Sequence, residues 1–402
     1  MRSPNAGAVS SVVAIAAVHG LVHALSIFLS PLNDEIRRYF LADSVATVTA
    51  FKSTYLATYA ASNLLFGLLT NRISARRTLA LGLAVNAAAV AAFAVVPPEG
   101  VGWMHALWLV AAIGGGVYHP VANVLITRLY PQGKGRVIGL TGTGAAIGFA
   151  LSPLMTTGLT AAIGLGWQDV ALAFGIFGMA AAVVVYAVVR DVPAGAEAPG
   201  AATPAPARLA GLGAIGGVLI AVVLISGARE MAMWSVLDIS DFFLLRLLGN
   251  GGRTGFYLFL LYAPGIVVQP LVGGLSDTLG RRWLATGAFA FYGVSVAAAG
   301  LLPGSLAFIP YLAMGIGQGA TIPIMEAFVA DVAGPELRGA AYGVFFTAGI
   351  ALGSVGPGGT GVVVDALGGG LDAFRLVFGV LGVLVVLGAC FIPRVIPGRA
   401  HV

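Results

Sequence analysis

Runs of about 20 apolar residues, the length that a helix needs to cross a bilayer, alternate with short polar segments along the chain. The first run is followed by Pro31 and Asn33 without a small-residue cleavage site, so it is interpreted as an uncleaved helix. The pattern predicts twelve membrane-spanning helices, near residues 9–31, 46–70, 78–97, 103–127, 137–162, 167–189, 211–236, 254–276, 283–303, 306–330, 340–366 and 373–393.

The composition agrees with a chain that is surrounded by lipid. Hydrophobic residues make up 58% of it and charged residues 9%, against about 25% charged residues in soluble domains. Glycine occupies 58 of the 402 positions, which favours close approach of membrane helices. The lone Cys390 excludes an intramolecular disulfide and a cysteine-based metal site. The net charge of +5 does not indicate a nucleic-acid partner, because the basic residues are scattered as loop pairs.

The distribution of Lys and Arg predicts the orientation in the membrane. An even number of spans places both termini on one side, and more than twice as many basic residues fall on that side as on the other. Because cytoplasmic loops are enriched in Lys and Arg, we expect a multi-pass protein of a bacterial-type inner membrane with both termini in the cytoplasm.

A segment rich in proline, glycine and alanine separates the first six spans from the last six. Such a composition cannot form a packed core and is typical of a flexible linker. The sequence therefore predicts an N-terminal six-helix bundle over 1–190, a cytoplasmic linker over 191–209 and a C-terminal six-helix bundle over 210–402.

The two halves contain matching blocks at nearly the same separation. Gly67 and Gly273 open one pair of matching segments, 206 residues apart (273 minus 67). Pro120 and Pro323 belong to a second pair, 203 residues apart (323 minus 120). Two independent blocks at nearly the same offset indicate a six-helix unit that is used twice.

The segment from Gly273 to Arg282 reads Gly-x3-Asp-x2-Gly-Arg-Arg, and it resembles the signature loop of the major facilitator superfamily. The resemblance implies an all-α membrane protein, with twelve transmembrane helices in two pseudo-symmetric six-helix bundles. It also implies secondary transport by alternating access, with the substrate held between the halves. The copy in the first half departs from the pattern, because Asn71 replaces the acid and Ser74 replaces the glycine.

The physical role expected of this loop is that of a conformational latch. An acid at a helix end can accept bonds from arginines and from the N-terminus of a neighbouring helix. The alternative is that the arginines only set the topology. The candidate latch residues are Asn71, Arg76 and Arg77 in the first half and Asp277, Gly280, Arg281 and Arg282 in the second.

Glycines and prolines recur in the fifth and eleventh spans, with Gly148 and Pro153 in one and Gly356 and Pro357 in the other. A helix bends at proline and packs closely through glycine. The pattern in the fifth span resembles that of superfamily antiporters, which favours export. Packing of small residues alone is the alternative.

The block from Ile113 to Pro120, which ends in Tyr118-His119-Pro120, resembles the fosmidomycin-resistance branch of the superfamily. That branch commonly carries a glutamate after His-Pro, where this chain has Val121. A role of that acid in proton coupling is therefore not available here.

Polar and ionisable residues inside the predicted spans are the candidates for the substrate or proton pathway, since a charge at the bilayer centre costs about 2.5–3.5 kcal/mol on insertion scales. They are His19, His23, His119, Asn123, Arg229, Glu230 and Glu326.

His19 and His23 lie four residues apart and share a helix face. That spacing suits zinc, but the sequence shows no third ligand, so no metal is expected and the two histidines are interpreted as pore-facing. His119 either takes part in function or satisfies the carbonyl freed by Pro120.

Arg229 and Glu230 are adjacent, about 100° apart around a helix, so at least one is expected to pair across helices. Snorkelling toward the outer face is the alternative. Glu326 is the best single carboxylate for carrying a proton, although sodium remains open as the coupling ion.

Together these residues favour proton-coupled export of a small molecule by a monomer without cofactors. The second transport hypothesis is proton-coupled uptake of a small organic anion that His23 and Arg229 hold. A membrane-embedded enzyme would need a nucleophile or metal constellation, which the sequence does not show. A non-transporting sensor would need a soluble signalling domain, and every loop is short. No nucleotide-binding loop occurs, so ATP is not expected as the direct energy source.

Overall fold

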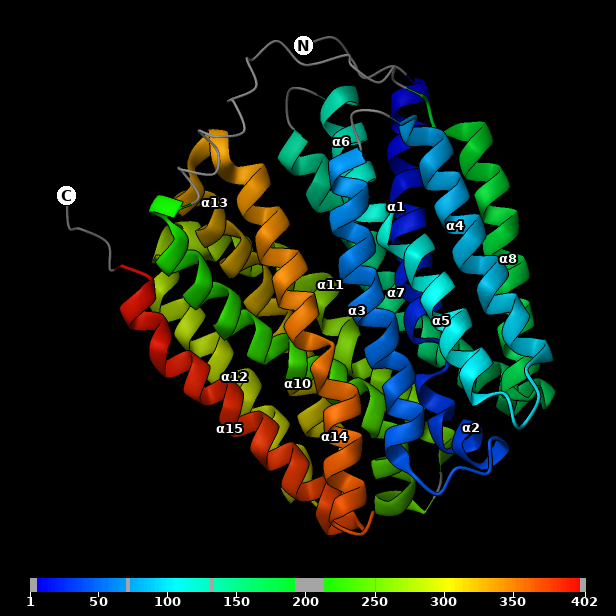
Figure 1. The fold of residues 1–402 in the computed structure, drawn as a ribbon. Helices are drawn as coiled ribbons and strands as arrows, with labels where there is room; N and C mark the ends of the chain where they lie inside the picture. The colour runs from blue at the N-terminus through cyan, green and yellow to red at the C-terminus, as the bar shows by residue number, and fades with distance from the viewer. Residues whose placement is uncertain (1–5, 70–72, 131–133, 192–212, 250, 398–402) are drawn as a thin grey trace. The chain divides into compact units, whose positions relative to one another are not determined.

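The computed structural model describes residues 6–69, 73–130, 134–191, 213–249 and 251–397, and within these ranges the chain is helical with short connections (Figure 1). The predicted linker over 191–209 lies outside the described residues, except for Asp191. The chain divides into two compact units, which are Met1–Leu41 with Thr54–Ala201 and Ala42–Ser53 with Ala202–Val402.

The first unit is built from helices that follow the first six predicted spans. They are α1 (Ala6–Ile27), η1 (Ser30–Leu32), α2 (Asn33–Tyr39), α3 (Val45–Leu69), α4 (Ala75–Ala92), η2 (Phe93–Val95), α5 (Val101–Gly116), α6 (Tyr118–Leu129), α7 (Lys134–Ile163) and α8 (Trp167–Val188). The first turns of α3 belong to the second unit.

The second unit follows the last six predicted spans. Its helices are α10 (Gly216–Leu248), η3 (Gly251–Arg253), α11 (Thr254–Leu279), α12 (Arg281–Leu301), η4 (Gly304–Leu306), α13 (Phe308–Gly353), α14 (Val355–Ala366) and α15 (Leu371–Val395).

Eleven helical segments in the described part of the chain are long and apolar enough to cross a membrane. The helix outside this group is α3, whose 25 residues extend for about 37 Å at 1.5 Å per residue but include several polar side chains. With α3 the described chain reaches the twelve membrane helices predicted from the sequence, so the prediction of an all-α membrane fold is confirmed.

The helix α13 carries most of one of these spans, Gly304–Ala333, and the first part of another, Leu337–Ala366, which continues through α14. The Tyr342 hydroxyl donates a hydrogen bond to the carbonyl of Glu326, 3.0 Å away. In a straight helix, residues 16 positions apart are about 24 Å apart along the axis. The chain therefore turns back between the two spans.

The seventh span is longer than the sequence predicted. It was expected to end near residue 236, whereas α10 continues to Leu248 and buries Asp238 and Asp241, which are 2% and 4% exposed. Asp241 accepts a hydrogen bond from the hydroxyl of Thr254, 2.8 Å away. An acid with a partner of this kind can stay inside the unit, so the charges do not mark the end of the helix.

Glycines bring helix backbones into direct contact in the first unit. A side chain at Gly148 would overlap the carbonyl of Gly20, and one at Gly144 would overlap the carbonyl of Ala16, so α7 and α1 touch through their backbones. Small residues at such contacts are the usual way in which membrane helices approach closely. The contact holds the histidine face of α1 against α7.

The first turn of α3 is capped by Asp365 of α14, within the second unit. The Asp365 carboxylate accepts hydrogen bonds from the backbone amides of Val45 and Ala46, at 2.9 and 2.8 Å, and from the Ser44 hydroxyl at 2.6 Å. A carboxylate at a helix N-terminus satisfies amides that lack partners within the helix. The start of α3 thus makes these hydrogen bonds within the second unit, to which it belongs.

Candidate functional site

The first unit brings three histidines together. His19 and His23 lie on α1, and their ring centroids are 4.9 Å apart, as four-residue spacing on a helix predicts. His119 comes from α6, with its ring centroid 4.9 Å from that of His19 and 5.7 Å from that of His23. One nitrogen from each ring lies within 4.8 Å of the others.

Aromatic and backbone contacts hold these rings in place. Tyr118 stacks on His19 with the centroids 4.3 Å apart, and the Tyr118 hydroxyl donates to the carbonyl of Ile15 at 3.1 Å. The His19 Nδ1 lies 2.9 Å from the carbonyl oxygen of Thr141 on α7. Phe149, also on α7, stacks on His23 at 4.3 Å. Two neighbouring helices therefore fix the orientation of the α1 histidines.

His119 reaches the cluster because the fourth span is interrupted. The helix α5 ends at Gly116 and α6 begins at Tyr118, one residue before His119. Gly114 lies against the backbone of α4 and Gly116 against Ser62, with no room for a side chain at either position. The glycine run thus lets the fourth span pack tightly where it presents His119.

The sequence did not reveal that His119 joins His19 and His23. A metal was not expected because no third ligand was evident, and the structure places His119 in that position. Asn123 is exposed and does not belong to this histidine cluster.

A second group of polar residues lies in the second unit around α10. Arg229 is 5% exposed, and its guanidinium forms an ion pair with the Glu230 carboxylate. The Trp234 indole N–H donates to Glu230 at 3.0 Å. Among the described residues the pair is made within α10, so the expectation of pairing across helices was wrong. Adjacent positions lie roughly 100° apart around a helix, but the Arg and Glu side chains are long enough for their charged groups to meet.

Glu326 of α13 is half-buried and lies within electrostatic range of both Arg229 and Glu230. Two buried tyrosines of neighbouring helices also interact electrostatically with Arg229 and Glu230. They are Tyr262 of α11 and Tyr292 of α12. The candidate carboxylate and the Arg229–Glu230 pair therefore form one polar group inside the second unit.

Two further buried charges were not among the sequence candidates. Lys52 of α3 is 4% exposed, and it interacts electrostatically with Asp238 of α10. Lys52 falls within the predicted span 46–70 but was not chosen as a candidate, and Asp238 follows the predicted end of the seventh span near residue 236. No local pattern in the sequence links Lys52 to Asp238, which follows it by 186 residues (238 minus 52), so this pair of charges could not be predicted from the sequence.

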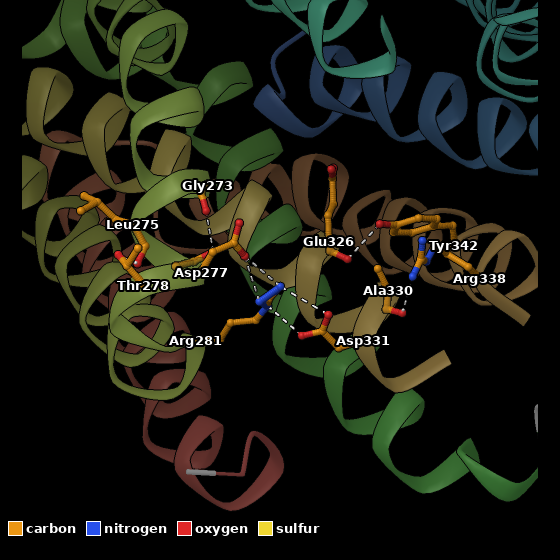
Figure 2. Close-up of polar contacts among 11 residues, drawn as sticks. Gly273, Leu275, Asp277, Thr278, Arg281, Glu326, Ala330, Asp331, Arg338 and Tyr342 are labelled. Carbon is orange, nitrogen blue, oxygen red and sulfur yellow. Dashed lines mark hydrogen bonds and ion pairs between the residues drawn. The ribbon is translucent and has the colours of Figure 1, made fainter. Parts of the chain in front are cut away.

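The candidate latch of the second unit is an acid–arginine–acid arrangement (Figure 2). Arg281, at the start of α12, lies 3.2 Å from a carboxylate oxygen of Asp277 and 3.1 Å from one of Asp331. It links the end of α11 to α13. Gly280 has φ of +87°, which is a conformation that favours glycine, and this explains the glycine between the acid and the arginines. Arg282 packs over the Trp283 ring at 5.1 Å.

The first-unit copy is built differently. Ser74, which replaces the glycine, caps α4 by accepting a hydrogen bond from the Arg77 amide at 3.3 Å, and its hydroxyl donates to Asp191 at 2.6 Å. Arg76 packs over the ring of Tyr186 at 5.0 Å, and the Arg77 side chain is exposed. Asn71 lies outside the described residues.

The two candidate bends differ from one another. The helix α7 runs through Pro153 without interruption, whereas the corresponding span of the second unit is interrupted at Ser354, two residues before Gly356. Gly148 contacts α1, and a side chain at Gly356 would overlap Met231 and Ser235 of α10. Close packing is therefore what both glycines provide.

Comparison with known proteins gives a consistent picture. A family model described as Major Facilitator Superfamily matches residues 8–252 and 218–401. The uncharacterized MFS-type transporter Rv1250 of Mycobacterium tuberculosis (strain ATCC 25618 / H37Rv) is 31% identical over 123 residues, which is 30% of this chain but only 21% of that protein's length.

Solved structures of other transporters share the fold. A bacterial homolog of the human lysosomal transporter Spinster, in an inward-facing and unoccupied conformation, superposes with a TM-score of 0.84 at 17% identity, covering 99% of this chain and 100% of its own. The nucleoside transporter NupG superposes with a TM-score of 0.77 at 14% identity, covering 96% of this chain and 99% of its own.

Proposed function

This chain belongs to the Major Facilitator Superfamily, and on that premise we propose that it exports a small molecule in exchange for protons by alternating access. The protein is a multi-pass membrane protein. The proposal adds the direction of transport and the coupling ion, and it places both termini on the cytoplasmic side of an inner membrane.

The observation that carries the proton coupling is the polar group of Glu326, Arg229 and Glu230 inside the second unit. The charges of Arg229 and Glu230 cancel. The negative charge of an ionised Glu326 is therefore not offset within this polar group, and a bound proton would neutralise it. A carboxylate out of water favours its neutral form, and access to water favours ionisation. Alternating access would therefore load and release one proton at Glu326 in each cycle.

The same pair weighs against uptake of an organic anion by Arg229. A guanidinium that is already paired with Glu230 would have to lose that partner before it bound a substrate carboxylate. Breaking a buried pair is costly, about 3–5 kcal/mol when one partner is removed. Export also gains support from the glycine and proline residues of α7, which resemble those of antiporters.

The test is transport by the full chain in lipid vesicles under an imposed pH gradient, with a panel of small molecules that includes fosmidomycin. Fosmidomycin serves as the probe of the narrower branch resemblance. We expect a substrate to move against its own gradient while protons move the opposite way. Uphill movement of substrate and protons in the same direction would instead identify a symporter.

The variant Glu326→Gln tests the proposed proton carrier. It fixes the neutral form, so we expect loss of gradient-driven accumulation while exchange of labelled for unlabelled substrate continues. The matched control is Glu99→Gln in the exposed loop between α4 and α5, which should transport like the wild type. Undiminished accumulation by Glu326→Gln would assign the coupling to another group.

A further inference from the structure

We propose that His19, His23 and His119 form a binding site for a divalent transition-metal ion, for which Zn²⁺ is the probe. The site lies wholly within the first unit, on α1 and α6. It is separate from the Glu326 group, and the inference does not depend on the direction or coupling of transport.

The first support is convergence of ligand atoms. One nitrogen from each of the three rings lies within 4.8 Å of the other two. Zinc binds imidazole nitrogens at about 2.0–2.1 Å, so two ligands of a tetrahedral ion are about 3.4 Å apart. Closing the remaining gap takes shifts of about 1 Å, which small ring rotations can supply.

The second support is the state of His19. Its Nδ1 lies 2.9 Å from the Thr141 carbonyl, and a carbonyl can only accept, so Nδ1 carries the proton and donates. The neutral ring then has its lone pair on Nε2. This nitrogen is buried without a hydrogen-bond partner, in a residue that is 8% exposed. A buried nitrogen without a partner is costly, and a metal ion would satisfy it.

The surroundings of His19 also match those of metal-binding histidines. Such histidines usually donate their second ring N–H to a carbonyl or carboxylate, which fixes the tautomer and the ring orientation. Thr141 provides that carbonyl, and the stacked ring of Tyr118 restricts rotation on the other side. His23 is restricted in the same way by Phe149. The ligands are thus held in place before an ion binds.

The chemistry of three imidazoles selects the class of ion. The cluster has no carboxylate member, whereas Mg²⁺ and Ca²⁺ take oxygen ligands. Imidazole suits zinc, copper, iron and nickel. Three histidines leave the fourth position of a tetrahedral zinc ion open. Because neutral imidazoles do not balance the charge of the ion, we expect an anionic donor in that fourth position.

The experiment measures Zn²⁺ binding by the full chain in detergent, purified through a tag that contains no histidine. We expect about one tightly bound Zn²⁺ per chain, and a visible absorption spectrum typical of tetrahedral coordination when Co²⁺ replaces it. Wild-type protein that takes up no Zn²⁺ at millimolar concentration would overturn the proposal.

The chain provides its own matched controls, because it contains five histidines. His105 of α5 lies 2.9 Å from the Thr54 hydroxyl and is outside the cluster, and His401 is in the C-terminal segment beyond the described residues. The double variant His105→Ala/His401→Ala should bind Zn²⁺ like the wild type. His23→Ala and His119→Ala should each bind at least about tenfold more weakly, since even loss of an outer partner costs 10–100-fold.

Binding by His23→Ala and His119→Ala that equals the wild type would contradict the assignment. If these variants do not fold, X-ray absorption of zinc-loaded wild-type protein decides the question. Scattering from three imidazole rings supports the site, and scattering from one ring or none overturns it.

Discussion

Arg229 and Glu230 are neighbours on α10, and their ion pair keeps a guanidinium that is 5% exposed neutralised inside the second unit. An isolated charge in that place would be far more costly than the pair, because neither water nor lipid headgroups solvate it there. The ion pair with Glu230 is therefore needed to keep Arg229 buried, independently of any role of the pair in transport.

This dependence leads to a prediction for Glu230→Gln. Removal of the acid leaves Arg229 buried and unpaired, so we expect destabilisation by about 3–5 kcal/mol, measured as a lower unfolding temperature in detergent. The double variant Arg229→Gln/Glu230→Gln should recover part of the loss. Asp372→Asn, which removes the partner of Arg375 at an exposed site where Asp372 is 93% exposed, should change little. Equal effects of Glu230→Gln and Asp372→Asn would contradict the argument.

The arginine of the second-unit latch contacts two acids, Asp277 and Asp331 (Figure 2). The side chains of both acids are more than half exposed, so their contribution to stability is small. We therefore predict that Asp277→Asn lowers the transport rate severalfold while the amount of folded protein in the membrane stays unchanged. A transport rate equal to the wild type would leave only a role in topology for this loop.

Helix α7 packs on α1 through Gly148, and this contact leads to the next prediction. Gly148→Ala places a methyl group on the carbonyl of Gly20, and overpacking of this kind costs about 1–3 kcal/mol. Gly158→Ala is the matched control on the same helix, because a side chain there meets no atom within 4 Å. We expect a lower unfolding temperature for Gly148→Ala alone. If both variants unfold at the same temperature, the close contact does not stabilise the unit.

The apolar runs predicted the existence of the helices well but not all of their ends. The seventh span was expected to stop near residue 236, and α10 continues for twelve residues beyond it. Asp238 and Asp241 lie just beyond the predicted end, and partners on other elements, such as Thr254 and Lys52, allow these acids to be buried. Tertiary partners of this kind leave no trace in local hydrophobicity.

For the candidate sites too, the sequence predicted contacts between residues close in the chain but not contacts between distant ones. The four-residue spacing placed His19 and His23 on one helix face, and the structure agrees. His119 follows His23 by 96 residues (119 minus 23), and only the packing of α1 against the fourth span brings it to them. Similarly, the sequence shows that Arg229 and Glu230 are adjacent. It does not show that they form an ion pair with each other, because that depends on the conformations of the two side chains.

The internal repeat is the feature of the whole molecule that the sequence predicted most directly. The pair of matching segments that Gly67 and Gly273 open lies at corresponding helix junctions, between α3 and α4 in one half and between α11 and α12 in the other. The repeat says nothing of which side faces the cytoplasm, which rests on the placement of Lys and Arg.

The orientation is therefore a separate prediction. A green fluorescent protein fused to the C-terminus should fluoresce, and alkaline phosphatase fused at the same place should be inactive, because both report a cytoplasmic location. The same pair of reporters at the N-terminus should give the same result. An active phosphatase at either end would reverse the assigned topology.

The central claim, export of a small molecule in exchange for protons, is tested most directly by measuring proton movement. Full-length protein is placed in vesicles that contain a pH-sensitive dye, without an imposed pH gradient, and a substrate from the transport panel is added outside. We predict that protons leave the vesicles as substrate enters, that the dye signal depends on a substrate gradient, and that Glu326→Gln abolishes this signal. Substrate entry with no proton movement, or with protons entering together with the substrate, would contradict the claim.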